Sequence, residues 1–170
     1  ASLHTSATNL GFQTFKCGAV LISNRYLLTA AHCVTRERLI GISMGREDLN
    51  DHTNIGRSTY RIKKIYVHPD YEPARDEFHD IAILQTDRKV EYSQKIWPYC
   101  LPASNQQLSD RFSVQLAGWG QVNSSSRASV LQSADLKMVD NSRCEWLWSQ
   151  HAPGHYNLLK GYSYPQGFTR

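Results

Sequence analysis

The sequence contains no apolar run long enough to cross a membrane as a helix. Its longest apolar runs are AVLI at 19–22 and IAIL at 81–84, whereas a membrane-spanning helix needs about 20 consecutive apolar residues. The chain also opens without the basic start and the long apolar core of a secretory signal peptide. We therefore predict no membrane association, and any secretory signal either was removed or lies upstream of these residues.

The sequence also lacks a concentrated charge of either sign. It has 19 lysines and arginines against 15 acidic residues, and its formal net charge is +4. The densest basic stretch, at 57–64, alternates with tyrosine and isoleucine as a half-exposed strand does. Nucleic-acid binding would need a contiguous basic face or a recognisable reader module, and the sequence has neither. We therefore expect no nucleic-acid partner.

Cysteine is scarce and is never arranged in a CxxC pair. The four cysteines are Cys17, Cys33, Cys100 and Cys144, and their spacing argues against a zinc ribbon and against thioredoxin-like redox chemistry. A zinc site between Cys144 and the two histidines of HAPGH (151–155) is disfavoured, because the proline and glycine of that stretch interrupt a helix. We predict no metal ion and no other cofactor.

Short period-two patterns, broken by glycine, proline, asparagine and aspartate, run through most of the sequence. The one convincing helix lies near 141–149, where Asp140 or Asn141 can cap it and where Cys144, Leu147 and Trp148 fall on one side. Many short strands with almost no helix predict an all-β antiparallel barrel or sandwich in one domain. The expected strands lie at 17–23, 26–31, 38–44, 60–67, 81–85, 112–118 and 134–139.

Three segments together resemble the trypsin/chymotrypsin family of serine proteases. They are LLTAAHC (27–33), HDIAILQ (79–85) with the downstream YCLP (99–102), and LAGWGQV (116–122). Smaller agreements occur between and after them, so that the resemblance runs through nearly all 170 residues in the order of the family. It implies a trypsin-like double antiparallel β-barrel, with the first barrel nearly complete and the second truncated.

The resemblance implies that His32 is the general base and that Asp80 is the carboxylate that orients it. These residue types suit the chemistry, because an imidazole near its neutral pKa can take the proton of a serine hydroxyl and a carboxylate can hold its tautomer. A histidine after an apolar run is more often a structural residue, and the joint occurrence of the motifs is what favours catalysis. The neighbouring His79 and Asp76 have no such support, and we interpret them as surface loop residues.

The family also implies roles for the cysteines. Cys17 and Cys33 occupy the positions of a disulfide that pins the histidine loop to the adjacent strand. Cys100 corresponds to a cysteine that bonds covalently to an upstream pro-segment or light chain in two-chain members, and the partner of Cys144 is expected just beyond this chain. A Cys100–Cys144 bond is the competing interpretation. Calcium is not expected, because Arg46 stands where calcium-binding members carry a glutamate.

The sequence departs from the family in its nucleophile, because no GDSGG motif occurs. Ser163, in GYSYP, lacks the closing glycine of a nucleophile elbow. We therefore expect residues 1–170 to be a partial protease domain that begins after the activation junction, ends before the catalytic serine and the pocket that selects substrates, and is inactive alone.

The expected whole protein is a secreted serine endopeptidase made as a zymogen, with polypeptide substrates and protein inhibitors as partners. Its alternative is a non-catalytic homologue that acts as a regulatory or binding protein. The triplet at 123–125 makes Asn123 a candidate for N-glycosylation, which leans toward secretion, although such triplets are common by chance.

Overall fold

The chain consists mostly of antiparallel strands with few and short helices. The computed structural model describes residues 1–6, 13–36, 38–51, 59–75, 78–103, 113–121, 126–139 and 141–151. Two compact units are present. We call Ala1–Leu101 together with Gly118–Leu131 unit 1, and Pro102–Ala117 together with Gln132–Arg170 unit 2.

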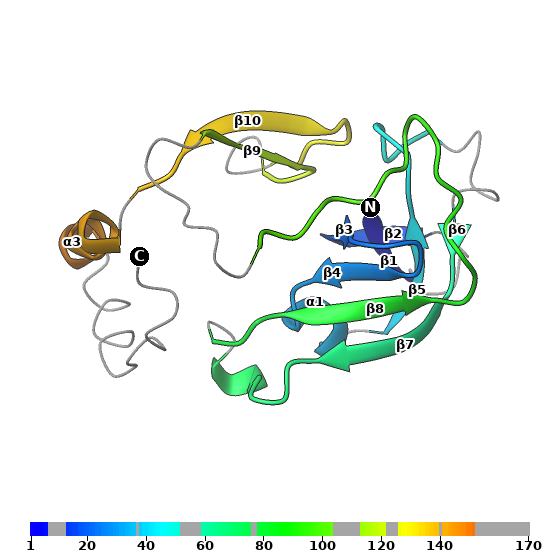
Figure 1. The fold of residues 1–170 in the computed structure, drawn as a ribbon, viewed down its shortest axis with the longest axis horizontal. Coiled ribbons are helices and arrows are strands. Elements are labelled where there is room, and N and C mark those ends of the chain that lie inside the picture. Colours follow the sequence, from blue (N-terminus) through cyan, green and yellow to red (C-terminus); the bar gives the residue numbers. More distant parts are fainter. Residues whose placement is uncertain are drawn as a thin grey trace. The chain divides into compact units, whose positions relative to one another are not determined.

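Unit 1 contains two four-stranded antiparallel sheets (Figure 1). Each sheet is assembled from strands that are distant in sequence, since β1 lies between β2 and β5, and β8 lies between β4 and β7. The first sheet has the order β2 (Gln13–Gly18), β1 (Ser2–Ser6), β5 (Leu39–Ser43) and β6 (Thr59–Tyr60). The second has the order β3 (Val20–Leu21), β4 (Tyr26–Thr29), β8 (Ala82–Thr86) and β7 (Ile62–Val67).

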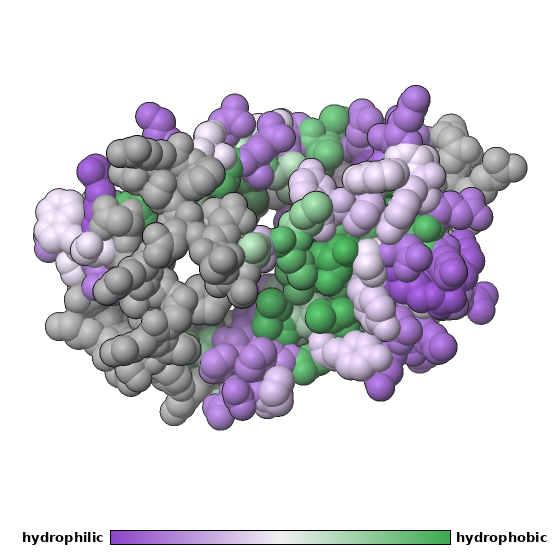
Figure 2. All heavy atoms as spheres, in the orientation of Figure 1, coloured by the Kyte–Doolittle hydropathy of each residue, from purple (hydrophilic) through white to green (hydrophobic). Residues whose placement is uncertain are grey.

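The hydrophobic core of unit 1 receives side chains from both sheets. Period-two alternation directs them inward, and in β8 the residues Ala82, Leu84 and Thr86 are buried while their neighbours are half-exposed. Figure 2 shows apolar residues also gathered on the visible face over β3 and β4. The buried apolar cluster consists of Leu3, Ala19, Leu21, Leu27, Cys33, Ile42, Met44, Tyr60, Leu84 and Val90.

Two of the predicted strands are each divided between the two sheets. The stretch 17–23 breaks at Ala19, whose N–H donates to the carbonyl of Ala1 at 2.9 Å. The stretch 60–67 breaks at Arg61, whose N–H donates to Asp87 Oδ1 at 3.1 Å and whose carbonyl accepts from the Asp87 N–H at 3.0 Å. In both places the backbone leaves one sheet and enters the other. A continuous apolar pattern in the sequence does not reveal such a crossover.

Strand β1 was not predicted, because its residues are mostly polar. Ser2, Leu3, His4 and Thr5 are nevertheless all buried, at 9% exposure or less. The strand is central in its sheet, and its backbone pairs with β2 on one side and β5 on the other. Position in the sheet, rather than hydrophobicity, therefore determines its burial.

Unit 2 contains a two-stranded sheet and a helix among the residues that the structure describes. The sheet pairs β9 (Ser113–Gly118, whose last residue belongs to unit 1) with β10 (Gln132–Lys137), and the helix α3 spans Asn141–His151. The predicted helix is thus confirmed, and the all-β class is confirmed as well. No helix within the described ranges is long and apolar enough to cross a membrane.

Candidate active site

The histidine loop begins where strand β4 ends. Thr29 closes the strand, and its hydroxyl donates to the carbonyl of Gly18 at 2.9 Å. Ala31, which is fully buried, then starts the short helix α1 (His32–Thr35), and its carbonyl accepts from the Val34 and Thr35 N–H groups at 3.0 and 3.1 Å. The small side chain of Ala31 lets the chain turn inside the core, and His32 follows at the first position of the helix.

Asp80 enters the same region from the segment that leads into β8. The residue before it, His79, has a φ of 54°, a left-handed backbone conformation that residues other than glycine adopt uncommonly. The carbonyl of His79 accepts from the Ile81 N–H at 2.7 Å, which forms a tight turn around Asp80. This turn places Asp80 two residues before the start of strand β8 at Ala82.

Asp80 and His32 are joined by two hydrogen bonds. His32 Nδ1 lies 2.6 Å from Asp80 Oδ2, and the His32 backbone N–H donates to Asp80 Oδ1 at 2.8 Å. The side chains are 38% exposed for His32 and 23% exposed for Asp80. The pair is therefore held from several directions while the ring keeps an open side.

The hydrogen bonds determine the charge of Asp80. Burial alone raises the pKa of this carboxyl, but the bonds from the backbone and ring of His32, the charge of that ring and the Ala31 N–H together hold the pKa below its ordinary value. Asp80 is consequently ionised at neutral pH and accepts from Nδ1–H. The other ring nitrogen, Nε2, then carries the lone pair of the neutral imidazole.

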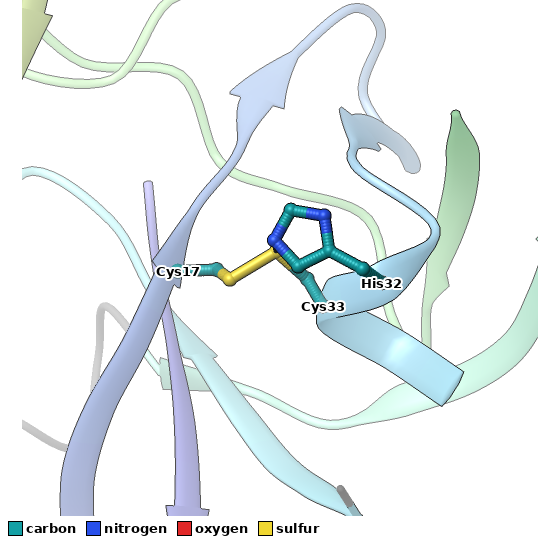
Figure 3. A group of neighbouring side chains, drawn as sticks. All are labelled: Cys17, His32 and Cys33. Atoms are coloured by element: carbon teal, nitrogen blue, oxygen red, sulfur yellow. Dashed lines mark hydrogen bonds between the residues drawn. A yellow bond between two sulfur atoms is a disulfide. The ribbon is translucent and has the colours of Figure 1, made fainter. Parts of the chain in front are cut away.

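A disulfide lies directly beside the ring. Cys17 on β2 and Cys33 on α1 are bonded, with their Cα atoms 6.2 Å apart. The Nε2 atom of His32 lies 3.4 Å from Cys33 Sγ. Figure 3 shows the imidazole next to the sulfur–sulfur bond, with Cys17 reaching it from the strand and Cys33 from the helix. The resemblance placed a disulfide here, but it gave no indication of which ring nitrogen faces the sulfur.

The other candidate residues are not part of this arrangement. Cys100 is an exposed free thiol of unit 1, and Cys144 is a half-buried free thiol on α3. Arg46 donates through Nη2 to the carbonyls of Leu49, at 2.6 Å, and of Asp51. The Arg46 guanidinium is therefore hydrogen-bonded to backbone carbonyl oxygens of the 46–51 segment. Asn123, Asp76 and Ser163 lie outside the described residues.

A second cluster of polar side chains was missed by the sequence analysis. The ring of His79 stacks on that of His68, with centroids 4.8 Å apart and 15° between the planes. Asp70 completes a group whose potential metal-ligating atoms all lie within 4.8 Å of one another. His68 Nδ1 accepts from the Asp70 N–H at 3.1 Å. In the sequence, this cluster is signalled only by His68 in VHPDY and by His79, directly before Asp80.

The chain is similar to many known serine proteases. It is 34% identical over 148 residues to "Serine protease filzig" of Drosophila melanogaster, a match that covers 85% of this chain and 8% of that protein. It is 33% identical over 152 residues to "Serine protease 7" of the same organism, with 80% and 39% covered. It is 31% identical over 155 residues to "Phenoloxidase-activating factor 3" of Holotrichia diomphalia, with 83% and 44% covered. The chain thus spans less than half the length of these relatives.

The fold and the family are supported by two further comparisons. A solved structure described as "Structure of GrC" superposes with a TM-score of 0.71 at 23% identity, covering 88% of this chain and 63% of the other, and this shows a shared fold. The family model described as Trypsin matches residues 2–155, which is most of the chain. The chain therefore belongs to the trypsin family.

Proposed function

We propose that this chain forms part of a single serine endopeptidase domain and supplies its general base, His32, and the carboxylate that orients the base, Asp80. The observation that carries the proposal is the double attachment of His32 to Asp80, at 2.6 Å through Nδ1 and at 2.8 Å through the backbone N–H. The ring bond selects the tautomer, and the backbone bond fixes the position of the helix turn that carries the ring.

The arrangement suits the activation of a serine hydroxyl. With its Nδ1 proton held by Asp80, His32 takes the hydroxyl proton at Nε2 and becomes an imidazolium, which the ionised carboxylate stabilises. These roles are the known ones of the trypsin family. They require a serine that approaches Nε2, and neither a GDSGG motif nor another candidate elbow occurs in the 170 residues. Residues 1–170 therefore contribute the base and its orienting acid, and should not hydrolyse peptides alone.

The partners proposed for the whole protein are polypeptide substrates and protein inhibitors. An upstream pro-segment or light chain bonded to Cys100 is consistent with the exposure of that thiol. Secretion is supported by the Cys17–Cys33 disulfide, because disulfides persist mainly in oxidising compartments.

A fluorophosphonate probe tests the claim about the nucleophile. The 170-residue chain should remain unlabelled at every serine, whereas the natural full-length protein, once activated, should be labelled at one serine. Labelling of any serine within residues 1–170 would refute the claim. If the full-length protein is not labelled and cleaves no peptide, the non-catalytic alternative is correct.

Substitutions in the full-length protein test the roles of the pair. His32→Ala and Asp80→Asn should each lower kcat/KM by about 10⁴-fold or more, because the base or its tautomer is lost. The control is Lys89→Ala, which removes an exposed side chain beyond the far end of β8 and should leave kcat/KM nearly unchanged. An active His32→Ala enzyme would contradict the assignment.

A further inference from the structure

The disulfide of unit 1 is in contact with the proposed base. Cys33 Sγ lies 3.4 Å from His32 Nε2, while Nδ1 of the same ring is 2.6 Å from Asp80. One sulfur of the disulfide, the imidazole and the carboxylate therefore form a continuous chain. Serine activation does not use the sulfur, so this contact has no part in the function proposed above.

The two sulfur-bearing residues differ in their access to solvent. Cys17 is half-buried on β2, which is an edge strand of its sheet. Cys33 is only 3% exposed and faces the ring. In thiol–disulfide exchange the incoming thiolate attacks one sulfur and the other leaves as a thiolate. The difference in exposure makes Cys17 the sulfur that is attacked and Cys33 the leaving group.

We propose that Cys17–Cys33 is a site of thiol–disulfide exchange with small thiols, in which His32 is the acid that protonates the departing Cys33 sulfur. The thiolate of glutathione, or of a similar thiol, bonds to Cys17 Sγ as the Cys17–Cys33 bond breaks, and the electron pair passes to Cys33 Sγ. A proton moves from Nε2 of the imidazolium to that sulfur. The products are a mixed disulfide at Cys17, a thiol at Cys33 and a neutral imidazole that regains its proton from solvent.

The second half of the exchange completes a two-electron reduction. Another small thiol attacks the mixed disulfide, Cys17 is released as a thiol, and the small thiol leaves as its oxidised dimer. The Asp80 carboxylate acts as a positioning residue, since its contact with Nδ1 holds the ring with Nε2 at the sulfur. Reduction separates α1, which carries the base, from β2. The proposal does not depend on proteolysis, because none of its steps involves a serine or a peptide.

The position of the modification gives the first test. The full 170-residue chain carrying Cys100→Ser and Cys144→Ser, which removes the other two thiols, is treated with glutathione and quenched directly with excess N-ethylmaleimide, which alkylates free thiols. Peptide mass spectrometry should find glutathione on Cys17 and the alkyl group on Cys33. Glutathione on Cys33, or an equal mixture at both positions, would overturn the assignment of the leaving sulfur.

The rate of the first exchange gives the second test. A neighbouring imidazolium stabilises a cysteine thiolate, and in thiol–disulfide exchange a better-stabilised sulfur leaves faster. His32→Gln should therefore slow the exchange roughly tenfold. Lys89→Gln, at an exposed position beyond the far end of β8, is the control and should leave the rate unchanged.

The sign of the effect separates chemistry from packing. If His32 only held α1 in place, its removal would expose the disulfide and speed the exchange. An equal or faster rate in His32→Gln therefore overturns the proposal. In His32→Ala, added imidazole should restore part of the lost rate, which a purely structural role does not predict, and a failure of this rescue in a variant that retains its disulfide would also count against it.

Discussion

In unit 1 both sheets turn side chains into a common core, whereas every residue of unit 2 whose burial the structure describes is exposed or half-buried. Leu27 and Leu84 have no exposed surface, while Leu116 and Leu136 are 62% and 45% exposed. Both regions use the same kind of antiparallel strand. The difference teaches that strand pairing is not sufficient for burial, and that the candidate site lies in the region that packs its own core.

The largest expected difference between the units is in the free energy of unfolding lost when a strand leucine is replaced by alanine. Leu84→Ala in β8 should destabilise the chain by about 2–5 kcal/mol, because it leaves a cavity in a fully buried position. Leu136→Ala in β10, at 45% exposure, should cost less than about 1 kcal/mol. Urea unfolding followed by far-UV circular dichroism measures both. Equal losses would show that unit 2 contributes a core of its own.

The second prediction concerns a polar side chain inside unit 1. His4 is 3% exposed, its Nε2 lies 3.0 Å from Ser2 Oγ, and its Nδ1 has no hydrogen-bond partner in the described part of the chain. Burial, and then the nearby charge of Arg46, lower the pKa of His4 to about 4. The folded chain therefore excludes a proton that the unfolded chain binds between about pH 4 and 6.5.

The sign of this effect is fixed by the lowered pKa. Stability is fully present above the unfolded pKa and is lost as the pH falls toward 4, by roughly 3 kcal/mol in total. His4→Gln should flatten this part of the stability curve. The check is a set of urea titrations at several pH values, and a native curve that is already flat in this range would contradict the burial of a neutral His4.

The smallest effect should distinguish two tryptophans. Trp119 in unit 1 is 7% exposed, and its Nε1–H donates to the carbonyl of Glu47 at 2.9 Å. Trp119→Phe should cost about 1 kcal/mol, because that carbonyl loses one of its two donors and keeps only the Leu131 N–H, at 2.7 Å. Trp146→Phe on α3, at 61% exposure, should change the free energy of unfolding by less than about 0.5 kcal/mol. The same urea titrations apply, and a larger loss at Trp146 would place that side chain in a packed environment.

The parts of the fold that alternate apolar and polar residues could be predicted from the sequence. Strands β4, β5 and β8 lie within or close to their expected ranges, because their inward residues are apolar. Strand β10 (Gln132–Lys137) is shifted by two residues toward the N-terminus from its expected range of 134–139, and all its residues are exposed. An exposed strand has no buried face to define its ends.

The candidate site was predicted by resemblance rather than by physical pattern. TAAHC and DIAIL named His32 and Asp80, but nothing in their spacing of 48 positions fixes a distance between them. The contact between Nε2 and Cys33 Sγ could not be predicted either, because adjacency in sequence does not say which ring nitrogen faces the sulfur. The four residues of α1 are also too few to show a helical period.

The Cys17–Cys33 bond has a topological consequence. Between these residues the chain leaves the first sheet at Ala19 and then runs through β3, β4 and the start of α1. The bond closes this whole path into a covalent ring that contains the crossover between the sheets as well as His32. While the ring is closed, the edge of the first sheet and the helix of the base cannot drift apart, even if the surrounding core loosens. Breaking the disulfide would remove this covalent link, and β2 and α1 would then be joined only by the backbone between them.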